Sequence, residues 1–274
     1  MADLSIIIVN WNTRQLLDGC LASIYGETKN INFEIFVVDN ASSDGSAEMI
    51  KEKYPAINLI INKKNCGFAA ANNQAIKEAQ GKYILILNSD TIILDGALNK
   101  LLDVLRSRPE VGILGAKTLN KDRTIQKTAR RDPTLLTQLF LPSKIKKLFQ
   151  NWRPFKEYYF DDFDYEKETF VPQLQGSFLL VKKEVFDKIG PFDEKFFIWF
   201  EEVDFCLRAR KTGYKILYSP AGSIVHYGGE SFSKLDTLKK QTLYSRSLLH
   251  YFWKNKPKWQ WFILYLLKFP LLFF

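Results

Sequence analysis

Residues 4–40 read LSIIIVNWNTRQLLDGCLASIYGETKNINFEIFVVDN, and this stretch decides the fold of the chain. An almost wholly apolar run stands at each end, and residues 13–25 between the two runs have the length of a helix. Strands that are covered on both faces are nearly continuously apolar, and parallel neighbours need a crossover connection, usually a helix. The stretch therefore predicts a strand–helix–strand unit with parallel strands.

The same alternation continues to residue 117 and predicts a mainly parallel, Rossmann-like α/β sheet flanked by helices. Further apolar runs, separated by helix-length segments, lie at 57–62, 83–90 and 111–117. The alternation then stops, and we expect 118–170, which is basic, aromatic and rich in proline, to be a variable insertion with short helices that faces the substrate. Strands are expected again within 175–190, at 214–219 and at 224–232.

Composition limits the possible classes of protein but does not identify the binding partner. The 274 residues allow one catalytic-size domain, and the formal charge of +9 would attract nucleic acid, an anionic membrane or a phosphorylated substrate. Cys20, Cys66 and Cys206 are an odd number with no C-x-x-C pair, which argues against a disulfide framework or a zinc site. The N-terminus has no basic n-region and no cleavage pattern, so we expect no signal peptide and a cytoplasmic protein.

Polar residues follow four successive predicted strands. They lie at 10–12, 39–46, 62–67 and 88–90. Ligands of open parallel sheets bind beyond the carboxyl ends of the strands, so these positions predict a binding site. Neither G-x-G-x-x-G nor G-x-x-x-x-G-K-[ST] occurs, which excludes the dinucleotide and P-loop ways of holding phosphate.

Three residues near these strand ends are candidates for ligand contacts. Asp90 has the carboxylate that a hard divalent cation prefers, although an Asx turn that closes the strand would explain it equally well. Asp39 precedes a Ser/Asp turn and can accept hydrogen bonds from a nucleobase or ribose. His226 precedes a Gly-Gly pair and offers an imidazole to manganese, although a lone histidine is more often structural.

WFEEVDFCLR, residues 199–208, places three carboxylates directly behind a run of large aromatic residues. Acids in the first turn of a helix are favoured by the helix dipole, and Asp204 can pair with Arg208 one turn later. That explanation suffices for Asp204 but not for the aromatic run. Apolar surroundings raise a carboxyl pKa and favour a general base, so Glu201 and Glu202 are candidate bases beside an aromatic surface for a sugar ring.

Six motifs, taken in order, resemble those of family 2 glycosyltransferases with the GT-A fold. They are LSIIIVNWN, VVDNASSDGS, NCGFAAANNQAI, LNSD, GSFLLVKKEVFDKIGPFDEKFFIWFEEVDFCLRARKTGY and IVHYGG. The chain most resembles rhamnosyltransferase-like bacterial enzymes of cell-surface polysaccharide synthesis, and the resemblance covers residues 4–230. It implies sugar transfer from a nucleotide diphosphate sugar with inversion at the anomeric carbon.

The resemblance also implies roles for individual residues. Glu202 occupies the position of the usual catalytic base, although Asp is commoner there, and Glu201 and Asp204 complete the acidic motif. Asp90 matches the last acid of the family's D-x-D motif, and with His226 it would hold Mn2+ or Mg2+. The nucleotide sugar would contact Asn10, Asn12, Asp39, Asn65, Gly67, Asn88, which replaces the first acid of D-x-D, and Ser89. The acceptor would contact Trp199, Phe200 and Gly176.

The expected activity is that of a metal-dependent inverting hexosyltransferase. The donor would be dTDP-rhamnose or a UDP-sugar, the acceptor a saccharide linked to polyprenyl diphosphate, and nucleic acid is not expected as a partner. Two alternatives stay open. A nucleotidyltransferase acting on sugar phosphates would release pyrophosphate from a nucleoside triphosphate, but it leaves WFEEVDFCLR unexplained. A non-catalytic sugar-binding module would not need Asp90, Glu202 and His226.

The chain ends in KNKPKWQWFILYLLKFPLLFF, residues 254–274, which joins lysines to an aromatic and aliphatic tail. We expect a catalytic domain over 1–235 and a helical, basic-aromatic, membrane-associating segment over 236–274. The tail is shorter than the roughly 20 apolar residues that span a bilayer, so an interfacial anchor on the inner face of the cell membrane is predicted. Trp259 and Trp261 would lie at headgroup level. A last helix packed on the core, or a hydrophobic segment that continues beyond this sequence, are the alternatives.

Overall fold

The computed structural model describes residues 2–140, 152–229 and 236–269. Within these residues, nine strands form one sheet with the order β3-β2-β1-β4-β10-β6-β11-β5, and β8 pairs with β11. The strands are β1 (Leu4–Asn10), β2 (Phe33–Asp39), β3 (Asn58–Ile61), β4 (Tyr83–Asn88), β5 (Thr91–Ile93), β6 (Val111–Leu119), β8 (Thr169–Phe170), β10 (Phe178–Lys182) and β11 (Lys215–His226). A separate small ribbon pairs β7 (Ala129–Arg130) with β9 (Gln173–Leu174).

Helices connect the strands and form the C-terminal part of the described chain. They are α1 (Arg14–Glu27), α2 (Ser46–Lys53), α3 (Phe68–Glu78), α4 (Ala97–Arg106), α5 (Leu135–Phe140), α7 (Arg153–Tyr159), α8 (Lys183–Ile189), α9 (Glu201–Lys211), α11 (Thr237–Asn255) and α12 (Lys258–Lys268). The expected insertion contains the short helices α5 and α7. Its residues 141–151, the end of the strand expected at 224–232, and residues 270–274 of the expected anchor lie outside the described residues.

Most neighbours in the main sheet are parallel, as the alternation of strands and helices predicts. β1 pairs in parallel with β2 and β4, β2 with β3, and β6 with β11. β10 is antiparallel to both β4 and β6, because it follows the insertion rather than a crossover helix. The strands expected at 214–219 and 224–232 are a single strand, β11, which has a bulge after Ser219.

Asp90 lies in a turn between two strands rather than at the end of one. The strand expected at 83–90 ends at Asn88, and Ser89 and Asp90 lead directly into β5. β5 pairs with the end of β11, and the Tyr227 amide donates to the Asp90 carbonyl at 2.9 Å. The backbone around Asp90 is therefore fixed on both sides by sheet hydrogen bonds.

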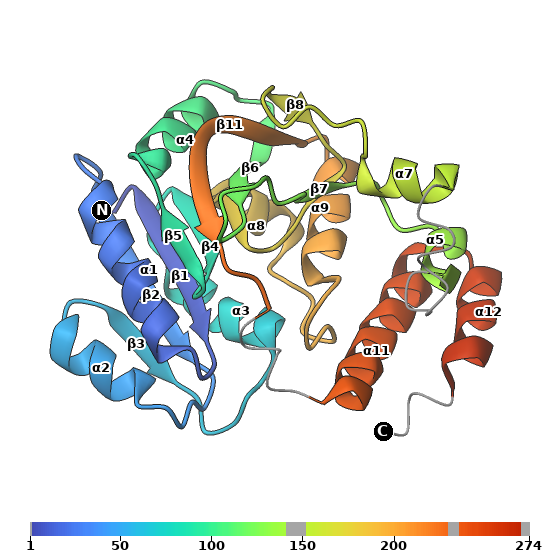
Figure 1. The fold of residues 1–274 in the computed structure, drawn as a ribbon, viewed down its shortest axis with the longest axis horizontal. Coiled ribbons are helices and arrows are strands. Elements are labelled where there is room, and N and C mark those ends of the chain that lie inside the picture. Colours follow the sequence, from blue (N-terminus) through green and yellow to red (C-terminus); the bar gives the residue numbers. More distant parts are fainter. Residues whose placement is uncertain (1, 141–151, 230–235, 270–274) are drawn as a thin grey trace.

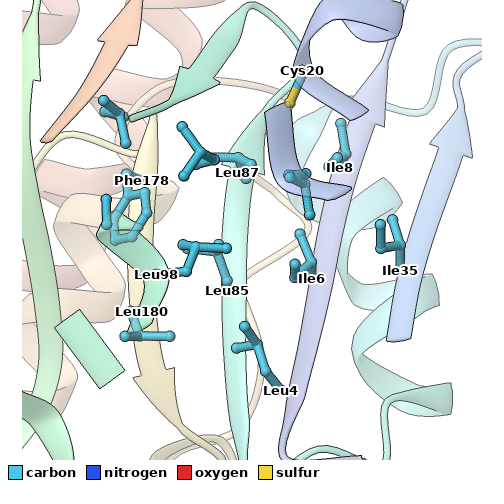
Figure 2. Close-up of a cluster of buried hydrophobic side chains, with 14 of the residues drawn as sticks. Leu4, Ile6, Ile8, Cys20, Ile35, Leu85, Leu87, Leu98, Phe178 and Leu180 are labelled. Carbon is cyan, nitrogen blue, oxygen red and sulfur yellow. The ribbon is translucent and has the colours of Figure 1, made fainter. Parts of the chain in front are cut away.

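Both faces of the sheet are covered, because successive side chains of a strand point to opposite faces. Leu4, Ile6 and Ile8 of β1 belong to a core that includes residues of α1, α2 and α4, part of which Figure 2 shows. Ile7 of the same strand belongs to a second core with residues of α3, α8 and α9. This layering explains why the strand sequences are nearly all apolar, and it leaves the ends of the strands to carry polar groups.

A third apolar cluster joins the C-terminal helices to the rest of the chain. α11 and α12 lie side by side at one end of the molecule (Figure 1). Phe252 of α11 and Leu264 of α12 are fully buried and pack in one cluster with Phe196 and Phe200, which precede α9. In the described part of the chain, no helix has both the length and the apolar character that crossing a bilayer requires.

Candidate active site

A cavity of about 460 Å3 lies where the polar strand ends meet. Its lining includes five residues that the sequence assigns to the nucleotide sugar or the metal: Asn65, Gly67, Asn88, Ser89 and Asp90. We call this the first cavity. Its position beyond the carboxyl ends of β1 and β4 is the one that the sheet topology predicts.

The first cavity is not lined by Asn10, Asn12 or Asp39. These residues belong to a hydrogen-bonded network next to it. Asp39 is 1% exposed, and its carboxylate accepts from Asn10 Nδ2 at 2.9 Å and from the Ser42 amide at 3.0 Å. Asn12 has a positive φ of 56° and accepts from the Ser43 amide at 2.7 Å. These contacts hold the loops after β1 and β2 together. If Asp39 binds a nucleobase, its carboxylate would do so while keeping the hydrogen bonds from Asn10 and Ser42.

Gly67 brings the start of α3 against the segment that leads to α9. The Phe68 amide donates to the Phe197 carbonyl at 2.7 Å, and a Cβ on Gly67 would stand 2.4 Å from that carbonyl oxygen. Together with its φ of 89°, this distance leaves room for glycine only. Asn65 fixes the same turn, because its Oδ1 accepts from the Gly67 amide at 2.9 Å.

Asp90 lines the first cavity, and His226 lies against Asp90 outside that lining. His226 Nε2 lies 3.2 Å from Asp90 Oδ1 and 3.2 Å from Asn88 Nδ2, and both Asp90 and His226 are buried. Gln126 decides the imidazole tautomer. Its amide nitrogen donates to Asn120 Oδ1 and to the His226 carbonyl, so its oxygen is the atom that faces His226 Nδ1 at 2.7 Å. Nδ1 therefore carries the proton, and in the neutral imidazole the Nε2 lone pair is directed toward Asp90 and Asn88.

The Asp90–His226 pair fits one side of the coordination sphere of a divalent cation. Two neighbouring ligands about 2.1 Å from a cation are about 3 Å apart at right angles, close to the distance observed here. Cations such as Mg2+ are commonly held by one or two carboxylates, several waters and substrate phosphates. Within the described residues, no group of three or more His, Cys, Asp and Glu is placed to hold a metal ion, so substrate or water would complete the sphere.

A second cavity, of about 240 Å3, contains the candidate base Glu202. Its other walls come from the insertion, from β9 and from α11. Among them are Thr128, Arg130, Tyr158, Tyr159, Gln173, Gln175 and Tyr244. Trp199 and Phe200, expected to contact the acceptor, line this cavity as well.

The two glutamates at the start of α9 are placed differently. Glu202 lines the second cavity, and its Oε2, like Glu201 Oε2, has no hydrogen-bond partner among the described residues. Burial raises the pKa of the Glu202 carboxyl, and backbone N–H groups and the Arg130 charge partly offset this rise. Glu201 is 4% exposed and lies outside both cavity linings. Burial raises the pKa of Glu201 well above its ordinary value, and the neighbouring Glu202 raises it further. Both shifts are in the direction that favours proton transfer near neutral pH.

The backbone before α9 is strained. Trp199 and Phe200 have φ values of 63° and 71°, a left-handed conformation that costs about 1–2 kcal/mol for each non-glycine residue. Phe200 is held there by burial against Tyr244 and Tyr251. Because Glu202 follows directly, the strained pair fixes the direction in which α9 begins.

Gly176 lies between the two cavities. A Cβ at this position would be 3.7 Å from Glu202 Cβ and 3.9 Å from Phe68 Cε1, and Phe68 lines the first cavity. The aromatic residues before α9 are also divided between the two cavities: Phe197 lines the first and Trp199 the second. A side chain larger than that of glycine would stand where the cavities adjoin.

Asp204 lies in a buried network away from both cavities. It is 0% exposed, and its carboxylate pairs with Arg208 Nε at 2.8 Å, as the sequence spacing suggests. It also accepts from Lys254 Nζ and Asn255 Nδ2, each at 2.9 Å. These contacts tie α9 to the end of α11, so Asp204 is placed to position Glu202 rather than to touch a substrate.

Sequence reasoning missed the contribution of the C-terminal part to the first cavity. Lys239, Leu243 and Arg246 of α11 line it. Their spacing of four and three residues places them on one face of a helix. This spacing is the sequence pattern that could have indicated a shared surface. Nothing in the sequence places that face against Asp90, because the packing of α11 on Phe196 and Phe200 decides it.

The fold and the site define a glycosyltransferase with the GT-A fold. A family model described as glycosyl transferase family 2 matches residues 5–190, and the chain belongs to this family. The N-acetylglucosaminyl-diphospho-decaprenol L-rhamnosyltransferase of Mycobacterium tuberculosis is 27% identical over 239 residues, which are 83% of this chain and 77% of that protein. The low-salt glycan biosynthesis hexosyltransferase Agl10 of Haloferax volcanii is 27% identical, over 78% of this chain and 64% of that protein.

Solved structures with low sequence identity share the fold. The mannosyltransferase PcManGT from Pyrobaculum calidifontis, solved with GDP-Man and Mn2+, has a TM-score of 0.63 at 19% identity over 96% of this chain and 68% of that chain. S. aureus TarS 1-349, solved with UDP-GlcNAc, has a TM-score of 0.55 at 18% identity over 90% of this chain and 66% of that chain.

Proposed function

We propose that the protein is a metal-dependent, inverting glycosyltransferase whose donor lies in the first cavity and whose acceptor lies in the second. The observation that supports this most directly is that Asp90, which is in contact with His226, lines one cavity, whereas Glu202 lines the other, with Gly176 between them. A single displacement needs the leaving diphosphate on one side of the anomeric carbon and the attacking hydroxyl on the other. In this proposal the two cavities would be those two sides.

In the proposed reaction, Glu202 accepts the proton of an acceptor hydroxyl as its oxygen forms a bond to the anomeric carbon. The bond from that carbon to the diphosphate oxygen breaks, and the nucleoside diphosphate leaves. Asn65 and Asn88 would orient the donor, and Lys239 and Arg246 would place positive charge near the diphosphate. A divalent cation held by Asp90 and His226 would offset the negative charge that grows on the leaving group.

A binding experiment tests the donor site. We expect at least one of dTDP-rhamnose, UDP-GlcNAc and GDP-mannose to raise the melting temperature in the presence of Mn2+, because a ligand that binds the native state stabilises it. Asp90→Ala should abolish the metal-dependent part of this binding in calorimetry. Asp103→Ala, an exposed residue of α4, serves as the control and should bind as the wild type does.

The products separate this proposal from the alternative of nucleotidyl transfer. A glycosyltransferase releases a nucleoside diphosphate from the nucleotide sugar, whereas a nucleotidyltransferase releases pyrophosphate from a nucleoside triphosphate. If Mn2+ and the nucleotide sugars leave the melting temperature unchanged and pyrophosphate is released from a triphosphate instead, the proposal fails.

For the substrates, we propose dTDP-rhamnose or a UDP-sugar as donor and a polyprenyl-diphosphate-linked saccharide as acceptor, in cell-surface polysaccharide synthesis. The name of the mycobacterial relative, a rhamnosyltransferase acting on a diphospho-decaprenol saccharide, supports this choice. A lipid-linked acceptor would require the protein to work at the inner face of the cell membrane.

α12 supports such a peripheral association. Trp259, Phe262 and Leu266 are 59%, 54% and 59% exposed, and their spacing places them on one face of the helix. Exposed apolar surface of this kind is typical of binding to a membrane or partner. Trp261, expected at headgroup level, packs instead against Trp253 and Tyr265.

The lysines of this segment do not form one membrane-facing cluster. Lys254 pairs with Asp193 and Asp204, and Lys268 is 8% exposed. Lys256 and Lys258 lie over the rings of Tyr251 and Trp253, and Lys256 is half-buried, with burial lowering its pKa. The apolar face would therefore carry most of the binding.

Vesicle sedimentation tests the association. The triple variant Trp259→Ser, Phe262→Ser and Leu266→Ser should lose co-sedimentation with phosphatidylglycerol vesicles, while Ile61→Ser, an equally exposed apolar residue of β3, should not. Equal sedimentation of the triple variant and the wild type would contradict the membrane role of α12. Substitution is a cleaner test than removing residues 254–274, because that deletion also takes away Lys254 and Asn255, which hold Asp204.

A further inference from the structure

The second cavity gathers buried polar atoms that have no hydrogen-bond partner among the described residues. They are Thr128 Oγ1, Arg130 Nη1 and Glu202 Oε2. Folded proteins pair the large majority of their buried polar side-chain atoms, so three unpaired atoms around one cavity call for an explanation. Thr128 is only 3% exposed, so the partner of its hydroxyl would be a water or a ligand inside the cavity.

Arg130 is held in place without a direct ion pair to a carboxylate of the described residues. Its guanidinium lies 4.9 Å from the centre of the Tyr159 ring, and Nη2 makes only a long contact of 3.4 Å to the Lys127 carbonyl. No carboxylate of the described residues lies within ion-pair distance of it. Arg210, by contrast, forms an ion pair with Asp132 at 2.6 Å. Arg130 therefore keeps donors available for a ligand.

The charge of the lining favours a neutral ligand. Arg130 and Glu202 are the cation and the carboxylate of the lining, and the other polar groups are amides, hydroxyls and phenols. Glu202 must be ionised to accept a proton, so an anionic substituent next to it would be repelled. A ligand with several hydroxyl groups can donate to Glu202 and accept from Arg130 and Thr128 at the same time.

The size of the cavity favours a single ring. Its volume of about 240 Å3 is below the roughly 300–1,000 Å3 of sites that take drug-sized molecules. Trp199 and Tyr159 give the cavity aromatic surface against which the apolar face of a sugar ring can pack.

We propose that the second cavity is the subsite for the terminal unit of the acceptor, a neutral pyranose, in which Arg130 and Thr128 recognise oxygens next to the hydroxyl that faces Glu202. This assignment rests on the proposed glycosyl transfer and specifies its acceptor side. Arg130 and Thr128 act as specificity residues. The proton is accepted by Glu202.

Binding of simple glycosides tests the subsite without the natural acceptor. Methyl glycosides of glucose, galactose, rhamnose and N-acetylglucosamine would be titrated by saturation-transfer NMR, with methyl glucuronide as the anionic probe. We expect at least one neutral glycoside to bind, and Arg130→Met to weaken it about tenfold or more, because a hydrogen bond from a charged donor is lost. Thr128→Val should weaken it about threefold. Arg131→Met is the matched control, because Arg131 stacks on Phe160 outside the lining and should leave binding unchanged.

Nucleotide-sugar binding in the presence of Mn2+ is measured on the same variants and should stay at the wild-type value, which also shows that they are folded. In a transfer assay, Arg130→Met should raise the KM for acceptor and leave the KM for donor unchanged. The subsite is overturned if no neutral glycoside binds, if only the glucuronide binds, or if Arg130→Met binds as the wild type does. Glycoside binding that depends on Arg130 in a protein that binds no nucleotide sugar would instead refute the proposed function and leave the subsite in place.

Discussion

The two cavities differ in how their polar atoms are satisfied. Next to the first cavity, Asn10 at the end of β1 donates to Asp39 at the end of β2, and Gln126 fixes the ring of His226 against Asp90; in its lining, Asn65 accepts from the Gly67 amide. In the second, Thr128, Arg130 and Glu202 each keep a buried atom without a partner among the described residues. The first cavity is thus organised before a ligand arrives, whereas the second leaves polar atoms to which water or a ligand can bond. If, as proposed, the first cavity takes the donor and the second the acceptor, binding of the two substrates would differ in its sensitivity to substitution.

The largest expected effect concerns the base. Glu202→Gln keeps the shape of the side chain but removes its ability to accept a proton, so transfer should fall by about a hundred- to ten-thousand-fold. Donor affinity should be unchanged, because Glu202 lies outside the first cavity. Steady-state kinetics with calorimetry of donor binding would check both. If Glu201→Gln is inactive and Glu202→Gln is active, the roles of the two glutamates are reversed.

A smaller effect is expected from the residue that sets the His226 tautomer. Gln126→Leu removes the acceptor for Nδ1–H, and losing such an orienting partner typically weakens metal binding about 10- to 100-fold. Titration with Mn2+ in the presence of nucleoside diphosphate would measure this. Arg123→Gln, an exposed change in the same segment, is the control and should retain affinity, and a Gln126→Leu variant that binds Mn2+ as the wild type does would argue against the tautomer role.

α11 allows the charge of the first cavity to be tested. Lys239→Gln removes an exposed cation from the lining, and a solvent-screened charge is worth little, so nucleoside diphosphate binding should weaken only about threefold. The difference in nucleoside diphosphate affinity between Lys239→Gln and the wild type should shrink at high salt. Lys240→Gln, one residue away and outside the lining, is the matched control. A Lys239→Gln variant that binds as the wild type does at low salt would remove α11 from the donor site.

The smallest expected effect is on stability and reports on the buried Glu201. Its folded-state pKa is raised by burial, so the folded protein holds this proton more tightly than the unfolded chain, and stability is lost as pH rises above the ordinary value of about 4.3. The Glu201→Gln variant has no carboxyl to ionise at this position, so it does not lose this stability as pH rises. Its melting temperature should match the wild type near pH 4 and exceed it by about 2 °C or more at pH 8. Scanning calorimetry at both pH values would show this, and a difference that does not grow with pH would contradict it.

The parts of the site that follow from local sequence were predicted, and the parts that depend on long-range packing were not. Asn65, Gly67 and Asp90 were placed at the first cavity because each follows an apolar run whose direction in the sheet is set by its neighbours. No local pattern shows that Arg130 of the insertion would face Glu202, or that β10 would run antiparallel between β4 and β6. These contacts join segments far apart in the chain.

Asp204 illustrates the same limit at the level of a single residue. Its pair with Arg208, one helical turn away, was predicted, because that spacing is fixed by the helix itself. Its contacts with Lys254 and Asn255 were not, because they depend on how α11 packs against α9. From the sequence alone, nothing therefore separated Asp204, held in a buried network, from Glu202, which lines a cavity.

The hairpin of α11 and α12 has a thermodynamic consequence. One of its faces lines the first cavity, another packs on the segment that leads to Glu202, and a third exposes Trp259 and Leu266. A lipid surface that favours one placement of the hairpin would change the affinity for the nucleotide sugar by some factor. Linkage then requires the nucleotide sugar to change the affinity for the surface by the same factor. A donor-loaded enzyme that prefers the membrane would reach its acceptor already charged with sugar.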